Sequence, residues 1–131
     1  MNNDFTKSFI AALCALCGFL FGDRDGLMIA LLGLIVMDYI SGVLAAVVEK
    51  RLSSEVGANG IAKKIFMLLI VAVANIVDIN VIGEGHVLKG VTVMFYIANE
   101  CISLIENAGR LGVPVPKKLL DVLEQLKKED I

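Results

Sequence analysis

The sequence predicts an all-α, polytopic membrane protein with four transmembrane helices, three being the alternative, and a short amphipathic helix at its C-terminal end. Of the 131 residues, 57% are apolar, whereas soluble domains usually have about 45–50%. A soluble fold of this size exposes too much of its area to water to bury such an excess. The apolar residues also gather in long runs separated by short polar segments, as expected for a single domain over residues 1–131 that crosses a bilayer repeatedly.

The first predicted span covers about residues 8–22 and is short. Its apolar run, Ser8–Phe21, extends roughly 21 Å as a helix, against a hydrocarbon core of about 30 Å. It is therefore predicted as a thin span, with a helix lying in the membrane interface as the alternative. Cys14 and Cys17 have C-x-x-C spacing but lie in this apolar run, so we interpret them as small packing residues and not as a redox pair.

The second predicted span, residues 26–48, follows a polar turn that has a glycine at each end, Gly22 and Gly26. Its length is roughly 34 Å, enough to cross the bilayer with some tilt. A single acid, Asp38, lies near its middle. Gly42 and Ala46 follow at helical spacing on the same face, and small residues on one face favour close packing of helices.

A polar segment, residues 49–64, precedes the third predicted span at about residues 61–80. Within it, Gly57–Gly60 predicts a turn. Four bases lie here, namely Lys50, Arg51, Lys63 and Lys64. Towards the end of the span, Asn75 and Asp78 are three residues apart and share a helical face.

The fourth predicted span, residues 88–106, is amphipathic. Polar side chains recur along it at steps of three and four residues, namely Tyr96, Asn99, Glu100, Ser103, Glu106, Asn107 and Arg110. Such a stripe needs a partner helix, water in a lumen or the headgroup zone to face. After a break rich in glycine and proline, the tail 107–131 contains a second amphipathic segment, with leucines on one face and Lys117, Lys118, Lys127 and Lys128 flanking them.

Basic loops indicate the cytoplasmic side of a membrane protein. The bases are concentrated in the segment 49–64 and in the tail, whereas the two other connecting segments carry one base each. Both basic regions, with Lys50, Arg51, Lys117 and Lys118 among their residues, are therefore predicted to be cytoplasmic. The charge distribution does not distinguish four spans from three. Contacts with anionic lipids are one interpretation of these bases, and gating or binding of a partner is the other.

Acids within apolar spans are costly, about 2.5–3.5 kcal/mol each at a helix centre. One interpretation is that they line or gate a polar path. The other is that they cap helix ends or pair with neighbouring polar groups and hold the bundle together. The candidates for pore lining or helix contact are Asp38, Gly42, Ala46, Asn75, Asp78, Tyr96, Asn99, Glu100 and Ser103.

The sequence does not predict an enzyme, a cofactor or a metal site. It contains no nucleophile and base in a catalytic pattern, no P-loop, no Rossmann glycine pattern and no zinc-ligand spacing. The net charge of −2 and the lack of a basic stripe interleaved with aromatic residues argue against nucleic acid as a partner. His86, the single histidine, is interpreted as a solvated loop residue.

Three stretches resemble the toxin-secretion and phage-lysis holin family. They are Met37–Ala46 with the sequence Met-Asp-Tyr-Ile-Ser-Gly-Val-Leu-Ala-Ala, then Gly60-Ile-Ala-Lys-Lys64, and then Ser103–Lys118, which ends in Pro-Val-Pro-Lys-Lys. Each motif is weak alone, but their order and spacing are specific, and together they cover roughly residues 27–128.

The resemblance implies a small phage or prophage protein of the host cytoplasmic membrane. Such proteins form homo-oligomers and open lesions through which an endolysin, or in some relatives a large toxin, escapes. Two further hypotheses stay open: an ion-channel or transporter subunit that uses the acids as a relay, and an antiholin-type inhibitor or anchor of another holin.

Overall fold

The computed structural model describes residues 3–22 and 25–130, with side chains described up to residue 126. Within these residues every regular element is a helix, which confirms the predicted all-α class. The elements in chain order are α1 (Asn3–Phe21), α2 (Gly26–Val48), α3 (Ser54–Val77), the short π-helix η1 (Asp78–Ile82), α4 (Val87–Arg110) and α5 (Lys117–Asp130). Among the described residues, four helices, α1, α2, α3 with η1, and α4, are long and apolar enough to cross a membrane.

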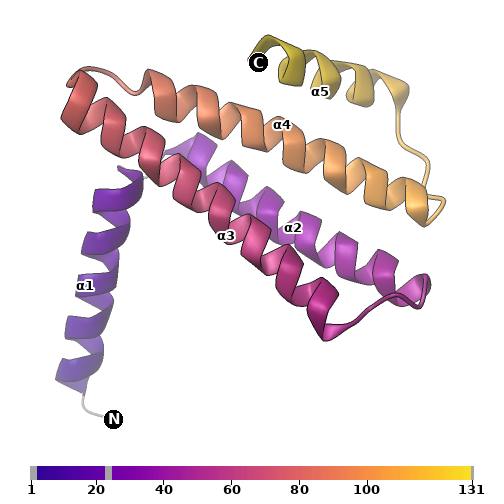
Figure 1. Cartoon of the computed structure of the whole chain (residues 1–131), viewed down its shortest axis with the longest axis horizontal. Helices are drawn as coiled ribbons and strands as arrows, with labels where there is room; N and C mark the ends of the chain where they lie inside the picture. Colours follow the sequence, from indigo (N-terminus) through magenta and orange to yellow (C-terminus); the bar gives the residue numbers. More distant parts are fainter. Residues whose placement is uncertain (1–2, 23–24, 131) are drawn as a thin grey trace.

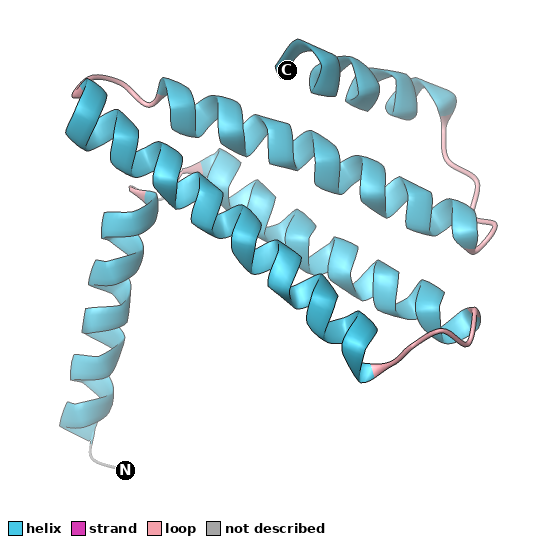
Figure 2. Cartoon of the chain, viewed as in Figure 1, coloured by secondary structure: helices cyan, strands magenta, loops and turns pink. Residues whose placement is uncertain are grey.

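Helices α2, α3 and α4 form a bundle in which α3 runs antiparallel to α2 and α4 (Figures 1 and 2), and their order in the bundle is not their order in the chain. α2 packs most extensively against α4, and α3 packs more against α4 than against α2, its neighbour in sequence. α4 is therefore the central helix of the bundle.

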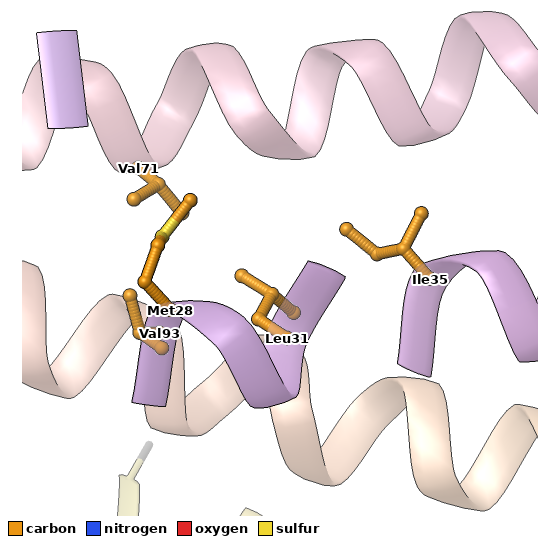
Figure 3. Close-up of a cluster of buried hydrophobic side chains, with 5 residues drawn as sticks. All are labelled: Met28, Leu31, Ile35, Val71 and Val93. Carbon is orange, nitrogen blue, oxygen red and sulfur yellow. The ribbon is translucent and has the colours of Figure 1, made fainter. Parts of the chain in front are cut away.

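An apolar core fills the half of the bundle nearest the beginning of α2 (Figure 3). Met28, Leu31 and Ile35 of α2 are spaced at three and four residues and point between the other two helices. Val71 of α3 and Val93 of α4 close the cluster, and Leu31 and Val71 are fully buried. This spacing places one stripe of α2 in the core and leaves its other faces outside.

Large apolar side chains cover the outer surface of the bundle. Val36, Ile40 and Leu44 of α2 and Phe66 and Ile70 of α3 are all exposed. A water-soluble bundle would carry polar residues at such positions. An apolar exterior of this extent is expected of a protein whose solvent is lipid.

α1 lies apart from this bundle and extends away from it at a wide angle (Figure 1). None of its described side chains is buried, and α3 is the one described helix against which it packs. Asn75 of α3 fixes its end, because the Asn75 amide donates hydrogen bonds to the carbonyl oxygens of Phe19 (3.4 Å) and Leu20 (3.0 Å). These carbonyls lack partners within α1, so one buried amide both caps α1 and joins it to the bundle.

Replacing Gly22 by alanine is expected to destabilise this joint by about 1–2 kcal/mol. Gly22 has a φ of +75°, which side-chain-bearing residues adopt at a cost, and an added Cβ lies 3.1 Å from Asn75 Oδ1. The thermal midpoint in detergent should fall. Gly18→Ala is the matched control, because a Cβ at that helical glycine meets nothing within 4 Å, and its midpoint should not fall. Equal midpoints for the two variants would contradict the strained joint.

The predicted turn at Gly57–Gly60 is wrong, because these residues lie within α3. The helix begins earlier than expected since the Ser53 hydroxyl accepts a hydrogen bond from the Val56 amide (3.1 Å) and so caps it. The two glycines instead make room for Tyr39 of α2, whose ring atoms lie 3.4 Å from a Cβ built at Gly60. The Tyr39 hydroxyl donates to the Gly57 carbonyl at 3.5 Å.

The predicted amphipathic helix of the tail is present as α5, which folds back along α4 (Figure 1). Leu123 is buried and Leu120 and Leu126 are half-buried, whereas Leu119 is 47% exposed. The flanking residues Lys127 and Lys128 lie outside the described side chains. The C-terminal segment is therefore part of the folded unit and not a free tail.

Candidate functional site

Three ionisable side chains, one from each helix of the bundle, meet inside it. The Lys64 ammonium of α3 lies 2.6 Å from the Asp38 carboxylate of α2 and 2.8 Å from the Glu100 carboxylate of α4. Asp38 is 5% exposed and Glu100 is 2% exposed, while Lys64 is 17% exposed. One lysine thus joins three helices by two short charge-assisted hydrogen bonds.

Asn107 of α4 extends this centre, since it lies seven residues, about two helical turns, after Glu100. Its amide nitrogen donates to Asp38 Oδ1 (3.1 Å) and to the Ser41 hydroxyl (2.9 Å), and Ser41 in turn donates to the Asp38 carbonyl (2.8 Å). Asp38 therefore receives bonds from both α3 and α4. We call these five residues the Lys64 cluster: Asp38, Ser41, Lys64, Glu100 and Asn107.

The three ionisable groups lie at one depth in the bundle. Asp38 is ten residues before the end of α2, Lys64 is ten residues after the beginning of α3, and Glu100 is ten residues before the end of α4. These three helix ends lie together, because α3 runs antiparallel to both α2 and α4 (Figure 1). At about 1.5 Å per residue the centre is roughly 15 Å from those ends. The three charged groups therefore lie inside the bundle and not at its end surface.

An ion pair nearer the helix ends continues the chain of polar contacts. Arg110 Nε donates to the Glu49 carboxylate at 2.9 Å, and its Nη2 contacts the same oxygen. Arg110 Nη1 also donates to Asn107 Oδ1 at 3.1 Å, so this pair is continuous with the Lys64 cluster. The hydrogen bonds from Arg110 lower the pKa of Glu49 below its usual 4.5.

This lowered pKa predicts a pH-dependent contribution from Arg110. Because Glu49 has the lower pKa in the folded state, the contribution is complete above its unfolded pKa and is lost as pH falls through the folded value. The thermal midpoint of Arg110→Met should lie below that of the parent at neutral pH and converge with it well below pH 4.5. Lys118→Met, at an exposed position on α5, serves as the control. A difference that persists unchanged in acid would contradict the assignment.

A pocket of about 340 Å³ opens above the Lys64 cluster between α2, α3 and α4. Both charged and small residues line it, including Asp38, Gly42, Lys63, Lys64 and Asn107. Its lining runs from the Lys64 cluster to residues nearer the helix ends, namely Leu52 and Arg110. The arrangement can therefore hold polar groups inside an apolar bundle.

A second polar cluster occupies the opposite end of the bundle. The Asp78 carboxylate accepts hydrogen bonds from the backbone amides of Leu88 (3.2 Å) and Lys89 (2.8 Å), in the first turn of α4. The buried Lys89 ammonium lies 3.5 Å from Asp25, which caps α2 through the Met28 amide (2.7 Å). That bond is the main reason why the pKa of Asp25 is lowered. This end of the bundle is a structural joint between helix ends.

The remaining predicted positions fall into four environments. Gly42 and Ala46 face α4, since a Cβ at Gly42 lies 3.6 Å from Asn107 and Ala46 is 4% exposed. Tyr96 packs against the apolar core and makes an edge contact with Phe95, the ring centroids being 5.4 Å apart. Asn99 and Ser103 are half-buried, and Ser103 lines the pocket. Five predicted bases are exposed: Lys50, Arg51, Lys63, Lys117 and Lys118.

Sequence reasoning missed the partners of the buried groups. The sequence predicts Lys64 as a base of the cytoplasmic loop, since it immediately precedes the apolar run from Ile65. In the structure its ammonium lies between Asp38 and Glu100. Lys89, in the first turn of α4, is also a buried base, with an exposed fraction of 5%. An acid within a membrane span needs a counter-charge, and for Asp38 and Glu100 this requirement points to Lys64.

Comparison with known proteins gives the same family as the motifs. A sequence model described as the bacteriophage holin family matches residues 15–128. Curated relatives align along almost the whole chain. An uncharacterised protein of Halalkalibacterium halodurans is 40% identical over 92% of this chain and 92% of its own length. An uncharacterised protein of Listeria monocytogenes is 43% identical over 89% and 83%.

A protein of Clostridium perfringens, named as an uncharacterised 14.9 kDa protein in the nagH 3' region, is 36% identical over 96% of both chains. No solved structure matches this chain.

Proposed function

We propose that this chain, which belongs to the bacteriophage holin family, oligomerises in the bacterial cytoplasmic membrane and opens lesions for a cell-wall-degrading enzyme or a toxin. The family is non-enzymatic, and the proposal assigns no catalytic residue, metal or cofactor. The lipid bilayer and other copies of the chain are its direct partners. The released endolysin or toxin needs passage and not a binding site.

The observation that carries the proposal is the charged cluster inside an apolar bundle. Glu100 and Asn107 lie on the polar face of α4 and are buried against α2 and α3. A polar face on a helix of membrane length needs either polar partners or water, and in the folded chain α2 and α3 are those partners. Polar residues on α4 supply the wall that an aqueous lesion requires, and Gly42 and Ala46 supply a close helix contact.

The distribution of bases supports an orientation with the C-terminus in the cytoplasm. The helix ends nearest the Lys64 cluster adjoin Lys50, Arg51 and Arg110, and α5 begins with Lys117 and Lys118. We propose that this end of the bundle faces the cytoplasm. Fusion of a cytoplasm-active reporter to residue 131 should then give signal, and fusion of a periplasm-active reporter should not.

The decisive experiment expresses the chain in a bacterium together with a cytoplasmic endolysin that has no export signal. An abrupt clearing of the culture after a delay is the expected result. Endolysin alone and the chain alone are the controls, and neither should clear the culture as quickly. Retention of endolysin in cells that accumulate the chain would contradict the holin proposal.

The two alternatives predict different outcomes in the same cells. An ion-channel or transporter subunit would collapse the membrane potential while the endolysin stayed inside. An antiholin-type partner would be harmless alone and would delay the clearing caused by a separate holin. The buried acids Asp38 and Glu100 are the feature that keeps the ion-relay alternative worth testing.

A further inference from the structure

We propose that the contact between α4 and α2 through the Lys64 cluster is a lock that holds the chain closed, and that lesion formation requires it to open. The proposal rests on the pore function proposed above. It concerns α4, because this helix carries the polar face and is also the central helix of the bundle.

The polar face of α4 is occupied in the folded chain. Glu100 bonds to Lys64, Asn107 bonds to Asp38 and Ser41, and Arg110 bonds to Glu49. These contacts recur over ten residues of one helix face, from position 100 to position 110. The same side chains cannot line a water-filled lumen while they are bonded to α2 and α3.

The closed chain and the proposed open lesion both provide partners for the same polar groups. In the closed chain, carboxylate, ammonium and amide bond to one another away from lipid. In an aqueous lesion, water replaces these partners. Exchanging a buried ion pair for two hydrated charges costs little free energy, because the attraction within the pair roughly offsets the cost of removing both charges from water. Two packings that both satisfy the polar groups and differ little in free energy form a two-state element.

The closed chain also has a place where this exchange can begin. α2 and α3 make few contacts with each other, and the pocket of about 340 Å³ lies where they diverge. Gly42 of α2 and Asn107 of α4 both line this pocket. Water that enters it reaches the bonds that hold α4 to α2 without crossing lipid.

The test locks α2 to α4 by a reversible cross-link. Cys14, Cys17 and Cys101 are replaced by alanine, and Gly42→Cys and Asn107→Cys are introduced. A Cβ at Gly42 lies 3.6 Å from the Asn107 amide nitrogen, so a short bis-methanethiosulfonate reagent spans the pair. The full chain is reconstituted in phosphatidylglycerol and phosphatidylethanolamine vesicles that contain fluorescent dextran.

The expected result is release of dextran before cross-linking, loss of release after it, and return of release when a reductant removes the link. The same double-cysteine variant treated with a monofunctional methanethiosulfonate of similar size is the control, and it should keep the release rate it has before treatment. Release from cross-linked monomers at the uncross-linked rate would overturn the lock. Cross-linking that yields covalent dimers would also overturn it, because α2 would then contact α4 of another copy.

A second pair keeps the lock testable if replacing Asn107 itself abolishes release. Gly42→Cys with Ser103→Cys also joins α2 to α4 across the pocket and leaves the Lys64 cluster intact, with a longer spacer in the reagent. The same three-step result is expected, and release from its cross-linked form overturns the lock. If the parent chain releases no dextran, the proposed pore function fails, and that outcome is distinct from release that cross-linking leaves unchanged.

Discussion

Replacement of Lys64 by methionine is expected to destabilise the folded chain by roughly 3–5 kcal/mol, the usual cost of leaving buried charges without their partner. Lys64 is the ammonium that contacts both Asp38 and Glu100, at 2.6 Å and 2.8 Å. Methionine has a similar length and suits an apolar bundle, so lost packing contributes little. The effect therefore comes from two carboxylates that are left together in the interior.

Lys63→Met is the matched control for this variant. Lys63 is the preceding residue of the same helix, is exposed and has the same side chain. Thermal unfolding in detergent should show a large fall of the midpoint for Lys64→Met and little change for Lys63→Met. Equal midpoints for the two variants would show that the ion pairs do not stabilise the fold.

Removing all three charges should restore most of the lost stability. The triple variant Lys64→Met, Asp38→Asn and Glu100→Gln has no unpaired charge, and neutral replacements of buried ion pairs are often tolerated. If the triple variant is as unstable as Lys64→Met alone, lost shape complementarity and not unpaired charge is the cause.

The sequence predicted the helices well and their partners poorly. Runs of apolar residues give the number and length of membrane helices, since each must span about 30 Å of hydrocarbon. Pairing depends on contacts between distant residues. The bond between Lys64 and Glu100 joins positions 36 residues apart, and the bond between Asn107 and Asp38 joins positions 69 apart. No local period encodes such separations.

The glycine pattern at residues 57–60 was ambiguous for a different reason. Glycine is favoured both in turns and where another chain segment approaches closely. At Gly57 and Gly60 the second explanation holds, because Tyr39 packs against them. Serine is a favoured N-cap residue, and Ser53 is the local signal for the observed beginning of α3.

Asp78→Ala is expected to have the second large effect, a loss of roughly 2–3 kcal/mol. The Asp78 side chain is 1% exposed and accepts hydrogen bonds from the Leu88 and Lys89 amides. These amides belong to the first turn of α4 and have no partner within the helix. The residue that directly precedes the helix, His86, makes no side-chain capping bond, so Asp78 replaces the usual local cap.

Glu84→Ala is the control for Asp78→Ala, because Glu84 is an exposed acid in the same connection between α3 and α4. Hydrogen exchange of the amides in the first turn of α4 should accelerate in Asp78→Ala and stay unchanged in Glu84→Ala, and the thermal midpoint should follow the same order. Fast exchange confined to this end would indicate local fraying. Fast exchange that also reaches the Lys64 cluster would indicate that α4 leaves the bundle as one unit, which is the motion that an opening lock requires. Unchanged exchange in Asp78→Ala would contradict the cap.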